Sequence, residues 1–419
     1  MLIIYDDFFL KHNTGYFHPE NSARLEAVKK FIHRSELVKK IKFIKPSSAT
    51  VDQVCMVHDR DYVARIKKLS ESGTVYHIDA DTVISPYTYD CAMLAVGGCL
   101  KGIDFLLHGK KIVKTAKTVK NTGKDNIDGS TYFKDQGYFF ALVRPPGHHA
   151  FPSTGSGFCI FNNISVAAKY SINHYGLSRV AIIDFDVHHG NGTQDIFYAD
   201  KKVFYTSIHQ YPHYPQTGYW TETGTNDGEY YNLNIPVMPY SEEPDYIIAF
   251  TDIIIPLLYG YQPELILVSA GFDAHEEDPL SSINLKDLSF YKMMKLIIYL
   301  KKMINLKNKG CCHGIGLFLE GGYASQATAR SVLKVIEACV EDEESSDKKE
   351  EPGFTEKGYK RRKYPKEQLP EEHNKAVKID SQGLKARYLS ESEARPGLNL
   401  INLKTFDNIK NIFNLSQVQ

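Results

Sequence analysis

The sequence predicts an α/β protein built on a single open parallel β-sheet with helices on both faces. Short apolar runs, each long enough for one buried strand, alternate along the chain with helical segments. This alternation is typical of βαβ units. Several of the runs end in polar residues and glycines, and ligands gather at the carboxyl ends of strands in open parallel sheets. The pattern therefore predicts the fold class and the location of a functional site together.

The segment 180–193 organises this prediction. Residues 180–183 form an apolar run, and polar side chains then follow at every second place, at Asp184, Asp186 and His188. Alternate residues of a strand share a face, so we expect these three side chains to point the same way. A buried cluster held by hydrogen bonds is the plainer interpretation. Three ionisable groups on one face are costly to bury without a metal ion or partners, which favours a site.

The remaining elements follow from the spacing of apolar residues. Strands are predicted at 2–5, 42–44, 138–143, 202–208, 230–236, 265–269 and 314–319. Helices are predicted from Asn21 or Ser22 to about residue 33, and at 51–70, 89–107, 164–175, 193–197, 246–258, 285–303 and 327–340. An extended connection rich in turn residues is expected at 79–86.

Composition predicts how the chain divides into domains. We expect one catalytic domain at 1–340, interrupted by a lysine-rich insertion at 109–136. A charged, flexible tail is expected at 341–397, because acidic and basic residues dominate it and prolines are scattered through it. Residues 398–419 contain enough leucine, isoleucine and phenylalanine to form one C-terminal helix that docks or binds a partner.

Charge and cysteine content exclude several classes of function. Lysine plus arginine equals aspartate plus glutamate, 50 each, so net charge gives no reason to expect direct nucleic-acid binding. Seven cysteines without a Cys-x-x-Cys pair do not predict a disulfide framework or a structural zinc site. With no visible signal peptide and no apolar run of membrane-spanning length, we expect a cytoplasmic or nuclear protein without a membrane partner. The sequence leaves the oligomeric state open.

Two strand ends supply candidate metal ligands. Asp186 and His188 follow one apolar run, and Asp273 follows a later one. Carboxylate oxygens and imidazole nitrogens bind zinc, and a catalytic zinc site takes three protein ligands and a water. We therefore predict a zinc ion on Asp186, His188 and Asp273, whose two carboxylates balance the charge of the ion.

Two more strand ends carry groups suited to proton transfer. His148 and His149 lie in a sharp turn and predict a general base with a second imidazole. A catalytic histidine is held in one tautomer by a partner on its other nitrogen, and Asp184 and Asn191 are the available partners. Tyr323, after two glycines, can donate a hydrogen bond to a carbonyl or its oxyanion. Together with a metal-activated water, these groups predict amide or ester hydrolysis.

At this point the motifs resemble those of the zinc-dependent histone deacetylase superfamily, including bacterial deacetylase-like amidohydrolases. The matching segments are His18-Pro-Glu20 with Arg24-Leu25, Arg144-Pro-Pro-Gly-His148-His149-Ala150, Gly155-Ser-Gly-Phe-Cys, Asp184-Phe-Asp186-Val-His188-His189-Gly-Asn-Gly-Thr, Ser207-Ile-His209, Ser269-Ala-Gly-Phe-Asp273-Ala-His275 and Leu319-Glu-Gly-Gly-Tyr323. They span residues 1 to about 340 apart from the lysine-rich insertion. The resemblance implies an arginase–deacetylase fold.

The resemblance also implies a role for each site residue. It implies zinc on Asp186, His188 and Asp273, with Tyr323 polarising the carbonyl. It implies His148 and His149 as the acid/base pair, oriented by Asp184 and Asn191 respectively. A structural potassium ion is implied as well, bound by the side chains of Asp184 and Ser207 and the carbonyls of Asp186, His188 and Ile208.

Substrate-binding residues are expected around the zinc site. In the family, two aromatic walls hold an extended alkyl stem, and Phe158 and Tyr214 match them here. Gly157 would let the stem approach the backbone. Asp81 resembles a rim position that hydrogen-bonds a peptide main chain.

The residue Leu280 favours a peptide over a polyamine. Some relatives that hydrolyse acetylpolyamines carry a glutamate at the corresponding place, and leucine cannot pair with a remote ammonium group. Glu276 and Glu277 lie nearby in sequence and keep acetylpolyamine hydrolysis open as the alternative.

We therefore expect a zinc-dependent protein lysine deacetylase that removes acetyl or another short acyl group from a protein or peptide substrate, with histone tails among the candidates. Two other classes are less consistent with the sequence. A non-catalytic reader of acylated lysine would have lost a metal ligand or Tyr323. A ureohydrolase of the arginase type would use paired metals and more aspartates than the chain offers.

Overall fold

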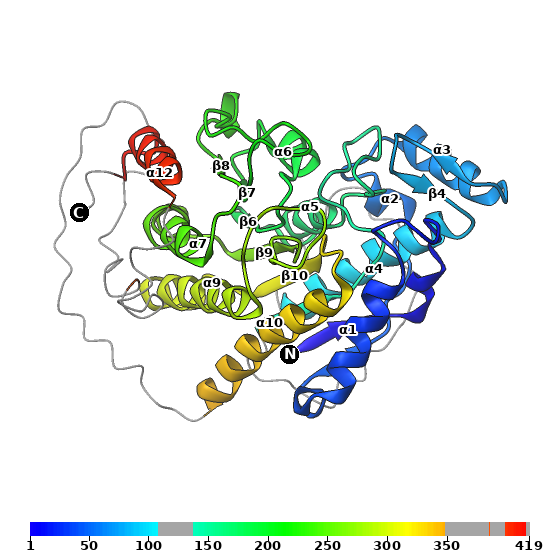
Figure 1. The fold of residues 1–419 in the computed structure, drawn as a ribbon, viewed down its shortest axis with the longest axis horizontal. Coiled ribbons are helices and arrows are strands. Elements are labelled where there is room, and N and C mark those ends of the chain that lie inside the picture. Colours follow the sequence, from blue (N-terminus) through cyan, green and yellow to red (C-terminus); the bar gives the residue numbers. More distant parts are fainter. Residues whose placement is uncertain (108–136, 348–384, 386–398, 416–419) are drawn as a thin grey trace.

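The structure is a computed structural model, and it describes residues 1–107, 137–347, 385 and 399–415. Within this part of the chain, eight strands form one sheet in the order β2-β1-β5-β10-β9-β6-β7-β8 (Figure 1). They are β1 (Leu2–Ile4), β2 (Lys42–Ile44), β5 (Tyr138–Ala141), β6 (Val180–Asp184), β7 (Val203–Gln210), β8 (Asn232–Val237), β9 (Leu265–Ala270) and β10 (Ile315–Leu319). Every neighbouring pair is parallel, which confirms the predicted fold class.

Burial explains why the strands are continuous apolar runs in the sequence. Every residue of β5, β6, β9 and β10 is buried. A parallel sheet that is covered on both faces has no solvent-facing side, so its strands lose the alternation of polar and apolar residues. The edge strand β2 is partly exposed instead.

Helices form the layers that cover the sheet (Figure 1). They are α1 (Ala23–Arg34), α2 (Val51–Val54), α3 (Arg60–Glu71), α4 (Thr88–Leu106), α5 (Asn163–Tyr175), α6 (Asn191–Phe197), α7 (Glu243–Ala249), α8 (Ile255–Tyr261), α9 (Asp287–Lys307), α10 (Ser325–Asp347) and α12 (Leu400–Ile412). Short helical turns are η1 (Asp7–Lys11), η2 (Glu36–Lys39), η3 (Asn226–Gly228) and η4 (Phe250–Ile254). Helix α10 packs between α1 and α9, and α4 packs against α5.

The helix predicted at 51–70 is two helices, α2 and α3, separated by a break. The reason lies in His58, which is buried and makes two hydrogen bonds to the chain far away in sequence. One ring nitrogen lies 3.3 Å from the carbonyl oxygen of Pro152, and the other accepts a hydrogen bond from the backbone N–H of Asn162 at 2.8 Å. Asp59 then adopts extended backbone angles, which end the helical path.

The helix predicted at 246–258 is also divided. Helix α7 begins earlier, at Glu243, and the π-helical turn η4 separates it from α8. A π-helical turn contains one extra residue and shifts the buried face of everything after it. Apolar spacing alone did not reveal that insertion because almost all residues of the segment are buried.

Two features lie beyond the predicted domain boundary at residue 340. Helix α10 continues to Asp347, because the acidic residues at its end find cationic partners on neighbouring elements. Glu343 accepts from the N-terminal amine of Met1, and Glu341 pairs with Lys295. Farther along, α12 forms in the region where a C-terminal helix was predicted and packs beside β8 (Figure 1).

The predicted connection at 79–86 contains the turn and second strand of a hairpin formed by β3 (Tyr76–His77) and β4 (Val83–Ile84). The predicted insertion at 109–136 lies outside the described residues, as does most of the predicted tail at 341–397, of which 341–347 and 385 are described. In the described part of the chain, no helix is long and apolar enough to cross a membrane.

Candidate metal centre and its surroundings

The end of β6 differs from the sequence prediction. The strand ends at Asp184, so Asp186 and His188 lie in the following loop and not on a pleated strand. Two side-chain caps shape this loop: Asp184 Oδ1 accepts the backbone N–H of Asp186 at 3.2 Å, and Asp186 Oδ1 accepts that of His188 at 2.9 Å. The polar residues are brought together by these turns, because short carboxylate side chains readily bond the backbone two residues ahead.

The predicted metal ligands lie together. Asp186, His188 and Asp273 are buried, and they offer ligand atoms within 4.8 Å of one another. His188 Nδ1 is 3.2 Å from Asp186 Oδ1 and 3.1 Å from Asp273 Oδ2. Asp273 comes from the loop after β9, the strand that pairs with β6 in the sheet. The carboxyl edge of the sheet therefore gathers these three residues as predicted.

The electrostatics of this cluster fit a cation. In the described part of the chain, no lysine or arginine forms an ion pair with Asp186 or Asp273. Burial disfavours charge on His188, but hydrogen bonds to the two carboxylates raise its pKa to about 10. The two buried carboxylates thus require positive charge at this point. A donor set of two carboxylates and one imidazole is one that zinc accepts.

Two glycines allow the strand ends to approach one another closely. A Cβ atom on Gly271 would lie 2.0 Å from Asp186 Oδ2, and one on Gly321 would lie 2.0 Å from Asp273 Oδ2. The backbone N–H of Gly321 also donates to Asp186 Oδ2 at 2.7 Å. The carboxylates are therefore held by the backbone of neighbouring strand ends, where any larger residue would displace them.

The tandem histidines have different partners. His148 Nδ1 lies 3.0 Å from Asp184 Oδ2, and His149 Nδ1 lies 2.8 Å from Asn191 Oδ1. Burial works against charge on both rings. The carboxylates of Asp186 and Asp184 raise the pKa of His148 to about 10, whereas burial and the charge of His148 hold the pKa of His149 well below its usual range.

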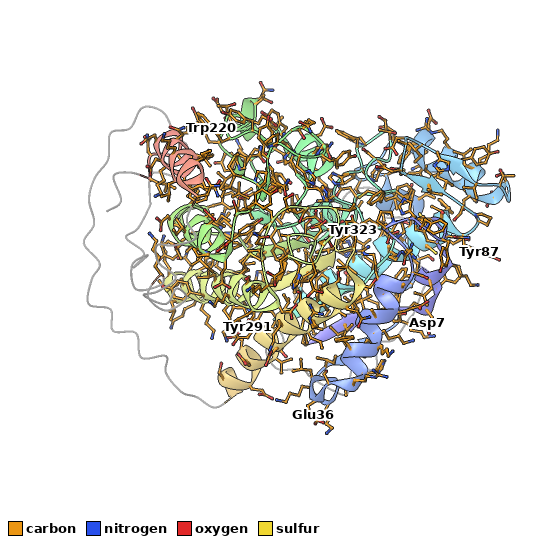
Figure 2. All side chains as sticks on the ribbon, in the orientation of Figure 1. Asp7, Glu36, Tyr87, Trp220, Tyr291 and Tyr323 are labelled. Carbon is orange, nitrogen blue, oxygen red and sulfur yellow. The ribbon has the colours of Figure 1, made fainter. Side chains whose placement is uncertain are left out.

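Tyr323 follows β10 and lies near the centre of the view in Figure 2. Its backbone N–H donates to Asp278 Oδ2 at 2.6 Å, and the guanidinium of Arg24 lies 5.0 Å from its ring centroid. Burial and the charge of Asp273 raise the pKa of the Tyr323 phenol well above its usual value. The phenol therefore stays protonated and can donate a hydrogen bond.

The predicted substrate residues lie around these groups. Phe158 has its ring centroid 5.6 Å from that of Tyr323, and Tyr214 has its centroid 5.2 Å from that of His149. Gly157 has a φ of +52°, and a Cβ there would lie 2.5 Å from His149 Cδ2. This residue combines a left-handed backbone with close contact, which requires glycine.

Asp81 and Leu280 lie at the edge of the same region. The carbonyl oxygen of Asp81 accepts a hydrogen bond from His18 Nε2 at 2.9 Å, and the His18 ring contacts Phe158. The carbonyl oxygen of Leu280 accepts from His213 Nε2 at 2.8 Å. The sequence prediction concerned only the side chain of Leu280. The structure shows that its main-chain carbonyl also takes part in the surroundings of the site.

The residues predicted to bind potassium are neighbours on two adjacent strands. Asp184 and Ser207 are direct partners in the register of β6 and β7. The Ser207 hydroxyl bonds His209 Nδ1 at 2.8 Å, and the Tyr205 hydroxyl donates to Asp184 Oδ2 at 3.2 Å. The structure thus brings Asp184 and Ser207 together, and potassium binding there stays a prediction.

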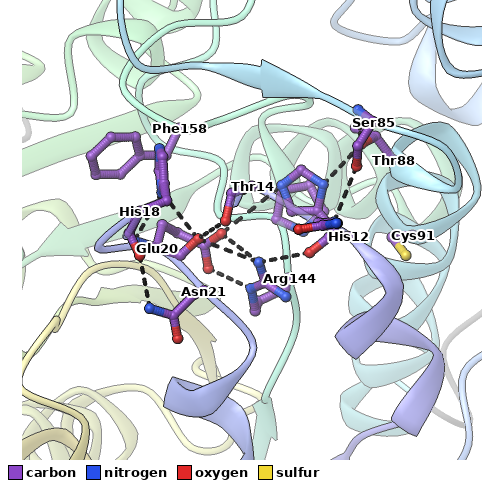
Figure 3. A network of polar contacts seen from close by, with 12 residues as sticks. His12, Thr14, His18, Glu20, Asn21, Ser85, Thr88, Cys91, Arg144 and Phe158 are labelled. Atoms are coloured by element: carbon purple, nitrogen blue, oxygen red, sulfur yellow. Dashed lines mark hydrogen bonds and ion pairs between the residues drawn. The ribbon is translucent and has the colours of Figure 1, made fainter. Parts of the chain in front are cut away.

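The sequence prediction assigned no role to a buried ion cluster around Glu20, whose contacts with Arg144 are drawn in Figure 3. Glu20 is fully buried and accepts hydrogen bonds from Arg144 Nε at 2.5 Å and from Arg24 Nη1 at 3.0 Å. Arg24 also donates from Nε to the carbonyl oxygen of Gly322 at 2.5 Å. The cluster joins the loop before α1 to the turn that carries the tandem histidines and to the turn before Tyr323. Its members stood in the matching motifs, but their spacing gave no sign that they meet.

Two further residues were missed. His213 stacks on His188 with ring centroids 4.9 Å apart, and Glu320 Oε2 accepts the backbone N–H groups of Gly147 and His148. His213 comes from a long loop without periodic pattern, so no sequence signal predicted its location. Glu320 directly follows β10, and a buried carboxylate at a strand end is the signal that could have identified it.

The fold and the site together define an α/β protein with two adjacent buried histidines beside a candidate metal centre. A family profile described as the histone deacetylase domain matches residues 18–339. A probable deacetylase of Archaeoglobus fulgidus is 34% identical, over 77% of this chain and 81% of its own length. Histone deacetylase 14, chloroplastic, of Arabidopsis thaliana is 33% identical, over 82% of this chain and 78% of its own length. The crystal structure of the HDA15 HD domain matches with a TM-score of 0.74 and 26% identity, covering 100% of this chain and 96% of that one. The chain belongs to the histone deacetylase family and has the arginase–deacetylase fold.

Proposed function

We propose that this protein is a zinc-dependent hydrolase that removes acetyl or another short acyl group from lysine side chains of proteins. One observation carries the proposal: Asp186, His188 and Asp273 converge beside two histidines with different partners and a protonated phenol. This set supplies a metal site, a proton acceptor, a proton donor and a carbonyl-polarising group, which amide hydrolysis needs.

Asp186, His188 and Asp273 would hold the catalytic ion. When bound, zinc would lower the pKa of a coordinated water to about 7 and polarise a carbonyl. The two buried carboxylates have only histidine partners among the described ion pairs, which supports a cation at this place, and the two-carboxylate, one-imidazole set supports zinc. A structural potassium ion beside Asp184 and Ser207 is part of the same proposal.

The partners of the two histidines assign them different tasks. Asn191 is uncharged, so it orients His149 and stabilises an imidazolium less than a carboxylate would, and His149 is suited to accept the proton of the attacking water. Asp184 is a carboxylate and stabilises a proton on His148, which is suited to donate to the leaving amine. Tyr323 donates a hydrogen bond to the carbonyl oxygen as negative charge develops there.

Several residues support an acylated peptide as substrate. The ring of Phe158 contacts Tyr323 and the ring of Tyr214 contacts His149, and we propose that the two rings flank an alkyl stem. Gly157 leaves room beside His149. Asp81 is partly exposed next to Phe158 and would accept from the peptide main chain. Acylated proteins, with histone tails among them, are the partners that we propose.

One ion pair disfavours the polyamine alternative. Glu277 is bound by Arg330 at 2.5 Å, and the same arginine is held by Asp287 at 2.8 Å. The charge of Glu277 is thus already matched and is less available to a substrate ammonium. Glu276 is exposed and remains as a possible partner for such a group.

The cysteines support a reducing compartment, which agrees with the proposed cytoplasmic or nuclear location. All seven lie in described residues, and none forms a disulfide. Thiols stay reduced in those compartments.

A substrate panel with metal analysis tests the proposal. Acetyl-lysine peptides, longer acyl-lysine peptides and acetylputrescine are compared at equal concentration, and bound metal is quantified in the same preparation. We expect one zinc per chain and a preference for acyl-lysine peptides. A large preference for acetylputrescine would replace the substrate class, and two manganese ions per chain would indicate a ureohydrolase.

A further inference from the structure

Helix α12 lies outside the matched family domain but is tied to the rest of the molecule by one buried amide. Asn402 is 1% exposed. Its Oδ1 accepts the backbone N–H of Met238 at 2.9 Å, and its Nδ2 donates to Ser241 Oγ at 2.7 Å and to Asp245 Oδ1 at 2.9 Å. The acceptor and both donors of the amide are thus used by one short turn, residues 238–241, and the start of α7.

The turn 238–241 in turn holds the loop 278–285. The backbone N–H of Tyr240 donates to the carbonyl oxygen of Ser282 at 2.6 Å. The backbone N–H of Asn284 donates to the carbonyl oxygen of Ser241 at 2.9 Å. These two bonds run in opposite directions, so they fix the spacing of the two segments as a pair of strands would.

The loop 278–285 contacts the candidate metal centre at three points. The hydroxyl of Ser281 donates to the carbonyl oxygen of Asp273 at 2.6 Å. Asp278 accepts the backbone N–H of Tyr323, as described above. The carbonyl oxygen of Leu280 holds His213, whose ring stacks on His188. A shift of this loop would therefore move groups on two sides of the site.

A simpler role for α12 is to cover the outer strand β8. Four buried apolar side chains would suffice for that: Phe406, Ile409, Phe413 and Leu415. Asn402 is not explained by covering, since a buried amide is costly unless each polar atom has a partner. An apolar residue would cover the same surface without that cost. The amide is explained if the geometry of the turn 238–241 matters, because directional bonds fix geometry more narrowly than apolar contact.

We propose that Asn402 is a positioning residue, through which α12 sets the location of the loop 278–285 beside the candidate metal centre. The C-terminal helix is thereby a part of the working enzyme. The expected change in KM rests on the proposed function, whereas the expected change in hydrogen exchange does not.

Three full-length variants test the inference. Asn402→Ala removes the amide. Asn408→Ala makes the same change at an exposed position of the same helix. Phe406→Leu weakens the apolar docking of α12 and leaves the amide in place. Hydrogen exchange of the amides of Tyr240 and Asn284, which donate the two bonds between the turn and the loop, is measured on each variant. Thermal unfolding, and KM and kcat for an acetyl-lysine peptide, are measured as well.

For Asn402→Ala we expect exchange at Tyr240 and Asn284 to become faster by about tenfold, as when one hydrogen bond that holds a loop is lost. We expect KM to rise severalfold at unchanged zinc content. Asn408→Ala should match the parent protein. Phe406→Leu should lower the unfolding temperature without these changes in exchange or KM.

Two results would overturn the inference: unchanged exchange at Tyr240 and Asn284 in Asn402→Ala, or an equal acceleration in Phe406→Leu at the same loss of thermal stability. The second result would mean that α12 only covers β8 and does not position the loop. Ser241→Ala provides an independent route if Asn402→Ala folds poorly, because it removes one partner of the same amide. If the parent protein does not hydrolyse the peptide, the proposed function fails, and the exchange measurements still decide whether Asn402 positions the loop.

Discussion

The two neighbouring histidines illustrate how the hydrogen-bond partner of an imidazole decides how readily the ring holds a proton. His148 and His149 are both buried, and their ring centroids are 4.0 Å apart. One faces a carboxylate and the other an amide, so a proton is stabilised more strongly on His148 than on His149. The tasks that we propose for them follow from Asp184 and Asn191 more than from the histidines themselves.

Replacing Asn191 with aspartate tests that division. The new carboxylate would stabilise a proton on His149 and raise its pKa. A proton acceptor works only when it is neutral, so the acidic limb of the kcat/KM profile should move to higher pH in Asn191→Asp. The pH dependence of kcat/KM for an acyl-lysine peptide measures this. A profile that keeps its acidic limb in place would assign the acceptor role to another group.

Tyr323→Phe removes the proposed hydrogen bond to the carbonyl oxygen. Loss of one such donor costs about 10²–10³ in kcat. We expect a fall of that size with zinc content and unfolding temperature unchanged, because the phenylalanine ring keeps its contacts with Phe158 and Arg24.

Tyr214→Phe is the matched control for that experiment. It also removes one phenol near the site, but this hydroxyl bonds Ser156 Oγ at 3.0 Å and has no proposed role in turnover. Its kcat should stay within about threefold of the parent value. Equal losses in the two variants would mean that neither phenol has a special function.

At the scale of elements, His58 shows how a single side chain can divide a helix. Its ring bonds backbone groups of residues 152 and 162, which fixes the break between α2 and α3. Burial lowers the pKa of His58 from its usual 6.5 to about 4. The folded protein therefore keeps His58 neutral at pH values where the unfolded chain binds a proton.

This difference predicts how stability depends on pH. The contribution of neutral His58 is complete above pH 6.5 and is lost as the pH falls from 6.5 to about 4. Its full size is about 3 kcal/mol at about 1.4 kcal/mol per pKa unit. In His58→Gln, whose amide can keep both hydrogen bonds but does not titrate, the free energy of unfolding should depend less on pH in this range. Denaturant titrations at several pH values measure this, and identical slopes for both proteins would contradict it.

Sequence reasoning predicted elements well where local pattern decides them. The strand ends and the long helices α4, α5 and α9 lie close to the expected ranges. It was wrong where a tertiary contact decides, as at His58 and η4, and at Asp186, whose location depends on hydrogen bonds in a turn after β6. Such contacts depend on tertiary structure, so the residue pattern of a short segment does not predict them.

At the scale of the whole molecule, too, some features could be predicted from the sequence and others could not. The parallel sheet and the meeting of Asp186, His188 and Asp273 could be predicted, because carboxyl ends of parallel strands share one edge. The positions of α12 and of Glu20 could not be, since both depend on packing between segments far apart in the chain. Glu20 bonds Arg144 at a separation of 124 residues, and Arg24 bonds the carbonyl oxygen of Gly322 at a separation of 298.

The Glu20 cluster therefore offers a test of how the whole molecule is held together. Glu20→Gln keeps the shape of the side chain and leaves two buried guanidinium groups without their shared counter-charge. Breaking a buried ion pair in this way costs about 3–5 kcal/mol. We expect a loss of that size in the free energy of unfolding at pH 7, measured by denaturant titration. A matched exposed variant, Glu36→Gln, should cost far less, because its partner Lys39 lies in solvent.

The same variant should change the response to acid. Burial alone would raise the pKa of Glu20, but the charges of Arg144 and Arg24 lower it well below its usual 4.5. A lowered carboxylate pKa stabilises the folded state above pH 4.5, and this contribution is lost as the pH falls below that value. The parent protein should therefore lose stability more steeply than Glu20→Gln between pH 4.5 and pH 3. If both proteins lose stability in parallel over that range, Glu20 is not the group that links the N-terminal loop, the histidine turn and the Tyr323 turn to pH.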